Sequence, residues 1–165
     1  MSAPVIRPIT ADDLPAIVRI NDAAYPAVPI TGADEMQRLI DHAAYAVAVD
    51  AAGDVVGFLL AMEPGRDYDS ENYRWFAERS ESFLYVDRIV LDPSLRGQGV
   101  GRRLYEAVFD RARLAGFGEV DCEVNVEPPN PGSLAFHARM GFEEVGRQST
   151  KGGQFVVSLL AAPVD

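Results

Sequence analysis

The sequence predicts an α/β fold on the strength of three observations. Residues 45–49 and 55–62 are apolar stretches of strand length, and the polar turn 50–54 between them is typical of a hairpin. An apolar strand at 83–91 leads through a glycine-rich turn into an amphipathic helix. Apolar and polar residues alternate strictly over 119–127, as in a strand with two different faces. Because 165 residues with 48% hydrophobic content can bury one sizeable core, we expect a single domain over residues 1–165.

The first third of the chain predicts a strand and two helices before the hairpin. A short strand over 5–9 is followed by Thr10 and Asp12, candidate caps of a helix that stops near Tyr25. Apolar residues at helical spacing predict a second helix over 34–42. After the hairpin, the segment 63–82 is polar, aromatic and irregular, and we expect one helical turn around Trp75 and Phe76. A connection of this length is often functional, so we interpret it as a lid over an acceptor site.

The strand at 83–91 is apolar except for Asp87 and Arg88 in its middle. Burying these charges is costly unless they are paired or solvated. Two interpretations stay open here, a strand that opens onto a cleft and a structural ion pair.

The stretch Arg96-Gly97-Gln98-Gly99-Val100-Gly101 joins this strand to the helix that runs on through Leu114. Glycines let the backbone turn tightly and approach a ligand closely, and the first turn of a helix presents free N–H groups. Three arginines and no acid lie between positions 96 and 103, in a chain whose net charge is -10. The pattern predicts an anion site, with a glycine-rich turn that holds no ligand as the alternative. It matches neither the dinucleotide fingerprint nor the P-loop.

Strand 119–127 places its apolar residues on one face and its acidic residues on the other. The acidic face is either solvated or a wall that attracts a cationic amine. Cys122 lies on the apolar face, so we interpret it as a core residue. Asn130 and Pro131 then begin a helix that reaches Met140 and ends at Gly141, and two strands near 142–146 and 154–160 close the sheet.

Two linked motifs resemble those of the GNAT superfamily of acyl-CoA-dependent N-acyltransferases. Residues 96–101 resemble the family's R/Q-x-x-G-x-G/A pyrophosphate loop, after Ile89-Val90-Leu91-Asp92-Pro93. The run from Asn130 through Ser133, Phe136 and His137 to Gly141-Phe142 resembles its N-x-x-A/S-x-x-F-Y-x-x-x-G-F helix. The resemblance implies a mixed, mostly antiparallel central sheet of about six to seven strands, splayed at the cofactor site and flanked by about four helices.

The resemblance also implies a set of residues that bind acetyl-CoA. Main-chain groups of the strand would pair with the pantetheine arm, loop amides and arginines would hold the pyrophosphate, and Asn130 would touch the thiol end. The expected cofactor-binding residues are Ile89, Val90, Leu91, Arg96, Gly97, Gln98, Gly99, Val100, Gly101, Arg102, Asn130 and Phe136. No metal-ligand spacing is present, so we expect no metal.

Acetyl transfer needs a base for the amine and an acid for the departing thiolate. Glu123 lines up with a residue that serves as general base in several family members, and Asp87 and Glu127 are alternatives. His137 occupies the position where many members carry the tyrosine that protonates the thiolate. It is either the acid or a packing residue.

The expected function is an N-acetyltransferase that moves an acetyl group from acetyl-CoA to a primary amine by direct attack in a ternary complex. The alternative is a non-catalytic module that binds or senses acyl-CoA. The acceptor is a small-molecule amine or an amine-bearing residue, and the acidic chain argues against nucleic acid and membrane partners. A single cysteine and the lack of a signal peptide at the start favour the cytoplasm. A monomer and a homodimer are both open.

Overall fold

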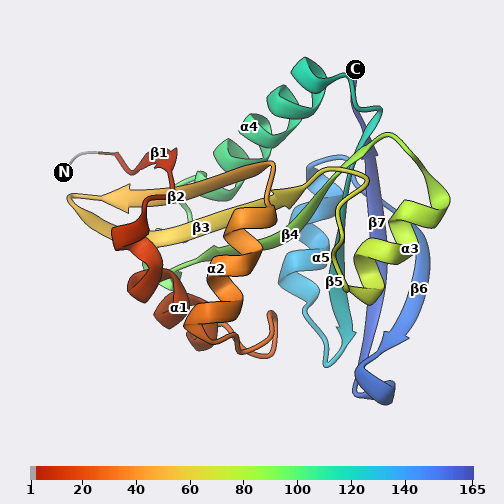
Figure 1. Cartoon of the computed structure of the whole chain (residues 1–165), viewed down its shortest axis with the longest axis horizontal. Helices are drawn as coiled ribbons and strands as arrows, with labels where there is room; N and C mark the ends of the chain where they lie inside the picture. Colours follow the sequence, from red (N-terminus) through yellow and green to blue (C-terminus); the bar gives the residue numbers. More distant parts are fainter. Residues whose placement is uncertain (1–2) are drawn as a thin grey trace. The chain divides into compact units, whose positions relative to one another are not determined.

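The computed structural model describes residues 3–165 and shows a seven-stranded mixed sheet in the order β1-β2-β3-β4-β5-β7-β6 (Figure 1). The pairs β1–β2, β2–β3, β5–β7 and β6–β7 are antiparallel, and β4 pairs with β5 in parallel. The predicted mixed, mostly antiparallel sheet of six to seven strands is confirmed. The strands are β1 (Val5–Pro8), β2 (Tyr45–Ala51), β3 (Asp54–Met62), β4 (Phe83–Leu91), β5 (Glu119–Glu127), β6 (Glu143–Thr150) and β7 (Phe155–Pro163).

Five α-helices lie within residues 3–165, where about four were expected. The additional helix is α3, which has nine residues where one helical turn around Trp75 and Phe76 was expected. Its start is fixed by Ser70, whose hydroxyl accepts a hydrogen bond from the Tyr73 amide at 3.2 Å. Tyr73 and Phe76, one turn apart, are both buried. The helices are α1 (Leu14–Ala23), α2 (Ala33–His42), α3 (Glu71–Arg79), α4 (Val100–Ala115) and α5 (Pro131–Arg139).

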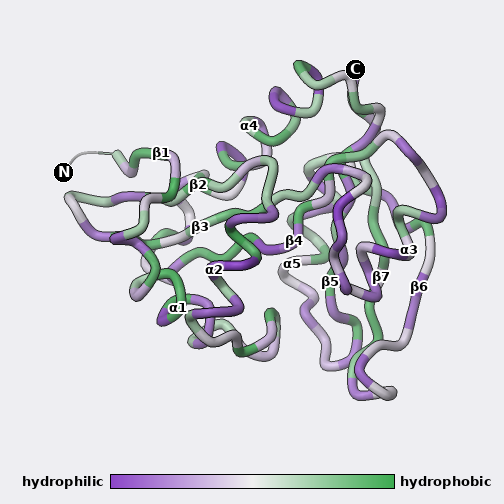
Figure 2. The backbone as a smooth tube through the Cα atoms, viewed as in Figure 1, coloured by the Kyte–Doolittle hydropathy of each residue, from purple (hydrophilic) through white to green (hydrophobic). Residues whose placement is uncertain are grey.

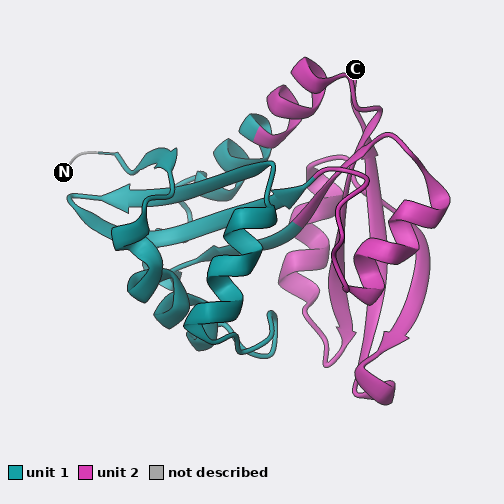
Figure 3. Ribbon diagram, in the orientation of Figure 1, with its two compact units in different colours: residues 1–62, 87–107 teal, residues 63–86, 108–165 magenta. Residues whose placement is uncertain are grey.

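The chain forms two compact units, coloured separately in Figure 3: residues 1–62 with 87–107, and residues 63–86 with 108–165. In unit 1, α1 and α2 both pack against β3. The hairpin between β2 and β3 turns at Ala52 and Gly53, which both have positive φ (55° and 93°), as the tight turn of a two-residue hairpin requires. The predicted hairpin is therefore confirmed. Before α1, the Thr10 amide donates to the Asp13 carboxylate at 2.7 Å, so the acidic partner at this helix start is Asp13 and not Asp12.

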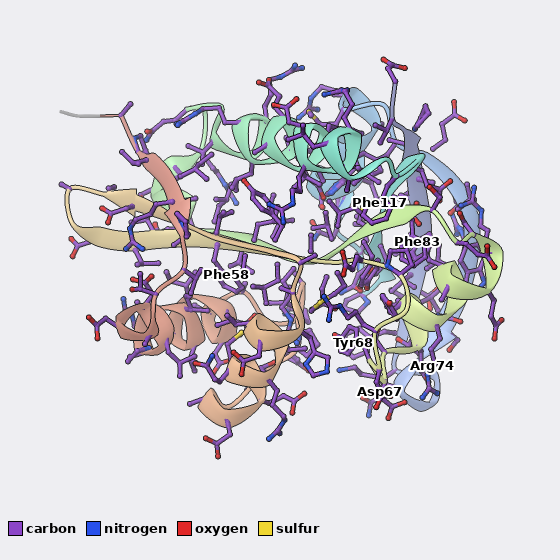
Figure 4. The ribbon with its side chains drawn as sticks, turned by 45° about the horizontal axis from the view of Figure 1, so that its top comes forward. Phe58, Asp67, Tyr68, Arg74, Phe83 and Phe117 are labelled. Atoms are coloured by element: carbon purple, nitrogen blue, oxygen red, sulfur yellow. The ribbon has the colours of Figure 1, made fainter. Side chains whose placement is uncertain are left out.

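Unit 2 contains an aromatic cluster that joins α3 to β4. The Tyr73 ring contacts Tyr68, Phe83 and Tyr85, with centroids 5.4–5.9 Å apart, and Phe76 contacts Tyr85 at 5.7 Å. Tyr68 and Phe83 are labelled in Figure 4. Edge-to-face packing of this kind stabilises a core beyond the area it buries. It also fixes α3 against β4, the strand that carries Tyr85.

Helix α4 follows the glycine loop and has the amphipathic pattern that the sequence predicts. In Figure 2 its residues alternate between hydrophobic and hydrophilic along the backbone, and Val100, Leu104, Val108 and Ala112 are buried. The helix ends at Gly116 with a φ of +80°, and the Phe117 amide donates to the Ala112 carbonyl at 2.9 Å. None of the helices within residues 3–165 has the length and apolar character needed to cross a membrane.

Candidate functional site

The glycine loop leaves β4 through a short 3-10 turn at Pro93–Leu95. Asp92 caps this turn, because its carboxylate accepts a hydrogen bond from the Ser94 amide at 2.8 Å. Gly97 and Gly99 then adopt positive φ values of 78° and 72°, which only glycine adopts without strain. A Cβ atom built on either glycine would meet no atom within 4 Å. Both glycines are therefore needed for the backbone turn, and the space in front of them is open to a ligand.

The start of α4 supplies donors beside these glycines. Its first main-chain helical bond runs from the Arg103 amide to the Gly99 carbonyl at 3.1 Å. The amides before Arg103 in the first turn therefore have no acceptor within the helix. A helix N-terminus of this kind favours negative charge. The observed loop thus fits a diphosphate group on two counts, open backbone and free donors.

The three arginines of this region have different environments. Arg103 donates from Nη1 to the Pro4 carbonyl at 2.9 Å, which ties the helix to the start of β1. Arg102 lies 4.0 Å from Glu106 one turn later, and both are exposed. Arg96 is also exposed. Arg96 and Arg102 are consequently the two side chains with freedom to reach an anion.

The end of β4 lies close to β3. Val90 is buried, while Ile89 and Leu91 are half-buried. The Asp92 amide donates to the Val56 carbonyl at 2.8 Å. A Cβ atom on Gly57 would lie 2.9 Å from the Val90 carbonyl oxygen, so glycine is required for this approach. These contacts hold in place the strand end that carries the expected pantetheine-binding residues.

Asp87 and Arg88 are both almost fully buried, and Arg88 Nε lies 3.4 Å from Asp87 Oδ2. Of the two interpretations, the ion pair is therefore present. Arg88 Nη1 also donates to Thr31 Oγ1 at 2.6 Å and to Asn21 Oδ1 at 3.0 Å. Asn21 in turn donates to the Pro29 carbonyl at 2.8 Å. Arg88 thereby fixes the connection between α1 and α2 to β4.

The Glu123 carboxylate is half-buried and accepts from the Tyr85 hydroxyl, at 2.9 Å to Oε1 and 2.7 Å to Oε2. Tyr85 belongs to β4 and is fully buried. The sequence analysis did not select Tyr85. Its signal was present, since a tyrosine in a buried strand needs a partner for its hydroxyl.

The expectation of a uniformly solvated or charged acidic face on β5 is wrong at Asp121, which is 0% exposed. Burial raises the pKa of Asp121 to about 10, and the nearby Glu119 contributes a smaller part of this rise. Among residues 3–165, neither carboxyl oxygen of Asp121 has a hydrogen-bond partner, so burial disfavours its charged form without compensation. Glu119 also forms an ion pair with Arg79 of α3. Helix α3, for which the sequence predicts only one turn, thus contacts this face through Arg79.

The helix motif begins as predicted, at Asn130, whose side-chain oxygen accepts from the Ser133 amide at 3.4 Å. Gly141, with a φ of +95°, ends the helix. His137 is only 4% exposed, and its ring packs edge-on against Phe136 and Phe142, each at 5.3 Å. Burial lowers the pKa of His137, and the hydrogen bond with the Ser133 carbonyl opposes this in part. The sequence leaves two roles open for His137, an acid or a packing residue. The buried, ring-packed environment is the one expected of a packing residue.

The two units each carry part of the expected site. Unit 1 brings together residues 87–102 of the strand end and loop, and unit 2 holds Glu123, Asn130, Phe136 and His137. Glu127, the other carboxylate considered, is exposed at the end of β5. No group of three or more potential metal ligands is found within residues 3–165.

The family model for the acetyltransferase (GNAT) family matches residues 14–142. The chain therefore belongs to the GNAT acetyltransferase family, as its two motifs and its sheet indicate.

Named relatives agree with this family. The chain is 34% identical over 145 residues to a mycothiol acetyltransferase from Propionibacterium freudenreichii, covering 81% of this chain and 41% of the relative. It is 33% identical over 109 residues to an L-methionine sulfoximine/L-methionine sulfone acetyltransferase from Pseudomonas paraeruginosa, covering 66% and 56%. The chain thus spans about half the length of these curated relatives. In fold it is similar to yncA from Salmonella typhimurium, solved with its cofactor acetyl-CoA, at a TM-score of 0.74 and 20% identity over 99% of this chain and 95% of that one.

Proposed function

We propose that this protein is an N-acetyltransferase that moves an acetyl group from acetyl-CoA to a primary amine within a ternary complex. The observation that carries the proposal is the loop at Gly97 and Gly99, with positive φ, open space over both glycines and the first turn of α4 behind them. Loop amides, with Arg96 and Arg102, would bind the pyrophosphate. Acetyl-CoA supplies an activated thioester.

Glu123 is the proposed general base. It is a half-buried carboxylate held by a neutral donor, Tyr85, and it can take the amine proton directly or through one water. Asp87 is a less suitable base, because it is buried beside Arg88. Asn130 would orient the thiol end from the start of α5, and Phe136 would contact the cofactor beside it. The departing thiolate would take its proton from solvent or from the amine itself. Direct donation by His137 is less suitable, because its imidazole is buried.

The acceptor class is proposed to be a small, polar amine. The two named relatives act on small molecules by their names, and one of these is an amino-acid analogue. Arg88 fixes the connection between α1 and α2, and the segment 63–70 precedes α3. We propose that these two segments select the acceptor.

The test of cofactor binding is Gly99→Val, with Gly116→Val as its matched control. Both glycines have positive φ, of 72° and 80°, with open space at the Cβ position, and they lie at opposite ends of α4. The two valines should therefore cost similar backbone strain, on the order of 1–2 kcal/mol. We expect calorimetry to show CoA affinity at least about tenfold weaker in Gly99→Val alone. Equal affinity in the two variants would contradict the proposed loop.

Turnover separates the enzyme from a non-catalytic acyl-CoA sensor. The burial of His137, which leaves the acid step without an evident side chain, is the observation that favours the sensor. Release of free CoA thiol from acetyl-CoA should rise when a panel of primary amines is added. Tight acetyl-CoA binding with no release across the panel would favour the sensor.

A further inference from the structure

We propose that Tyr85 is a positioning residue for the Glu123 carboxylate, and that α3 acts on the reaction through it. The inference rests on the proposed function, because Glu123 is assigned as the base only there. Its starting point is the contact of one hydroxyl with both carboxylate oxygens, at 2.9 and 2.7 Å. A donor shared between both oxygens restricts rotation of the carboxylate about its last bond.

The Tyr85 hydroxyl is itself held in place by its ring. The ring is 0% exposed and contacts Tyr73 edge-on at 5.7 Å and Phe76 at 5.7 Å. Tyr73 is fixed in turn, since its hydroxyl donates to the Glu63 carbonyl at 2.7 Å and accepts from the Arg66 amide at 3.0 Å. The position of the Tyr85 hydroxyl therefore depends on the packing of its ring against the rings of Tyr73 and Phe76 on α3, which a loss of the Tyr73 hydroxyl alone leaves in place.

Strand pairing explains why Tyr85 reaches Glu123. In the parallel β4–β5 ladder Tyr85 lies opposite Asp121, and Glu123 is two residues further along β5, on the same face as Asp121. A diagonal neighbour at this separation is within reach of an aromatic side chain. The contact is thus set by register, and a slip of one residue would remove it.

The charges around Glu123 in unit 2 make a neutral donor useful. Asp121 shares the face and retains its proton, Glu119 pairs with Arg79, and Leu159 lies opposite Glu123 in β7. A cation at the position of the Tyr85 hydroxyl would compete with the substrate amine for the carboxylate. A hydroxyl favours the ionised carboxylate by a hydrogen bond without adding charge.

The experiment compares Tyr85→Phe with Tyr73→Phe, alone and in a Glu123→Gln background. Both substitutions remove one buried hydroxyl and keep the ring. In Tyr85→Phe we expect kcat to fall about tenfold, the value of one hydrogen bond to a charged group. The acid limb of the pH profile should move to higher pH, because the ionised carboxylate loses a hydrogen bond, and CoA affinity should be unchanged. Tyr73→Phe should keep the wild-type pH profile, and Tyr85→Phe should have little further effect on Glu123→Gln.

A carboxyl-carbon NMR titration of Glu123 keeps this inference separable from the proposed function. Its midpoint should rise in Tyr85→Phe and stay in place in Tyr73→Phe, with or without turnover. An unchanged Glu123 midpoint in Tyr85→Phe would overturn the positioning role even in an active enzyme. Full activity of Glu123→Gln would also overturn the positioning role, because Glu123 would then not be the base. Absence of turnover with every amine would instead count against the proposed function, while the titration still reports the Tyr85 contact.

Discussion

The Nδ1 atom of His137 lies 2.7 Å from the main-chain carbonyl oxygen of Ser133, one turn earlier in α5. For a neutral imidazole this contact requires the proton on Nδ1, because a carbonyl can only accept. The ring is enclosed by Phe136 and Phe142, and burial lowers the pKa of His137. The imidazole is consequently neutral at neutral pH, with its Nδ1 proton already in use.

His137→Phe should therefore leave the pH dependence of kcat between about pH 6 and pH 9 as in the wild type. A role as acid would instead give the wild type a decline at rising pH that the variant lacks. Stability supplies a second measurement, because a lowered native pKa means that the wild type loses stability as the pH falls below 6.5, the ordinary pKa of histidine. Thermal unfolding at pH 5.5 and 7.5 should show a smaller loss in His137→Phe. If kcat of the wild type declines at rising pH and this decline is absent in His137→Phe, His137 acts as the acid.

Arg88 has three acceptors in unit 1, namely Asn21 Oδ1, Thr31 Oγ1 and, at 3.4 Å, the Pro29 carbonyl. Arg88→Met keeps most of the side-chain length and removes every donor, so we expect a loss of about 2–4 kcal/mol in the free energy of unfolding. Arg19→Met, at an exposed position on α1, is the control and should stay within about 0.5 kcal/mol of the wild type. Denaturant unfolding measures both. Equal stability of the two variants would mean that the α1–α2 connection does not depend on Arg88.

The elements that the sequence predicted well are those with a local signal. The hairpin at Ala52-Gly53 and the cap at Asn130 depend on residues within a few positions of each other, so pattern alone finds them. For helix α3 the sequence predicts only one turn, because its buried face is only Tyr73 and Phe76 within a polar segment. The short prediction for α3 also explains the error at Asp121, because a β5 face with no helix beside it would leave Asp121 in water.

The candidate site divides in the same way. The turn of the glycine loop and the helix after it were predicted, because both depend on the glycines themselves, and the role of the loop in binding a ligand stays a prediction. The Tyr85–Glu123 and Arg88–Thr31 contacts join residues 38 and 57 positions apart, and only strand register and packing bring them together. Sequence periodicity fixes the face of a residue and says little about which side chain lies across from it.

Asp121 gives the strongest pH dependence that the structure predicts for stability. Burial raises the pKa of native Asp121 to about 10, whereas the unfolded group releases its proton near 3.8, the ordinary pKa of aspartate. Between these values the unfolded chain binds fewer protons, so the contribution of Asp121 is fully present below pH 4 and is lost as the pH rises. The loss is up to about 1.4 kcal/mol for each pH unit.

Asp121→Asn should therefore be more stable than the wild type at alkaline pH, with an advantage that grows from pH 5 to pH 9. The amide has nearly the shape of the protonated carboxyl, but it does not ionise in this pH range. Asp54→Asn, the same substitution at an exposed position at the start of β3, is the control. Urea unfolding at pH 5, 7 and 9 measures all three proteins, and groups shared by them cancel in the differences. An advantage of Asp121→Asn that is the same at pH 5 and pH 9 would show that Asp121 ionises in the native protein despite its burial.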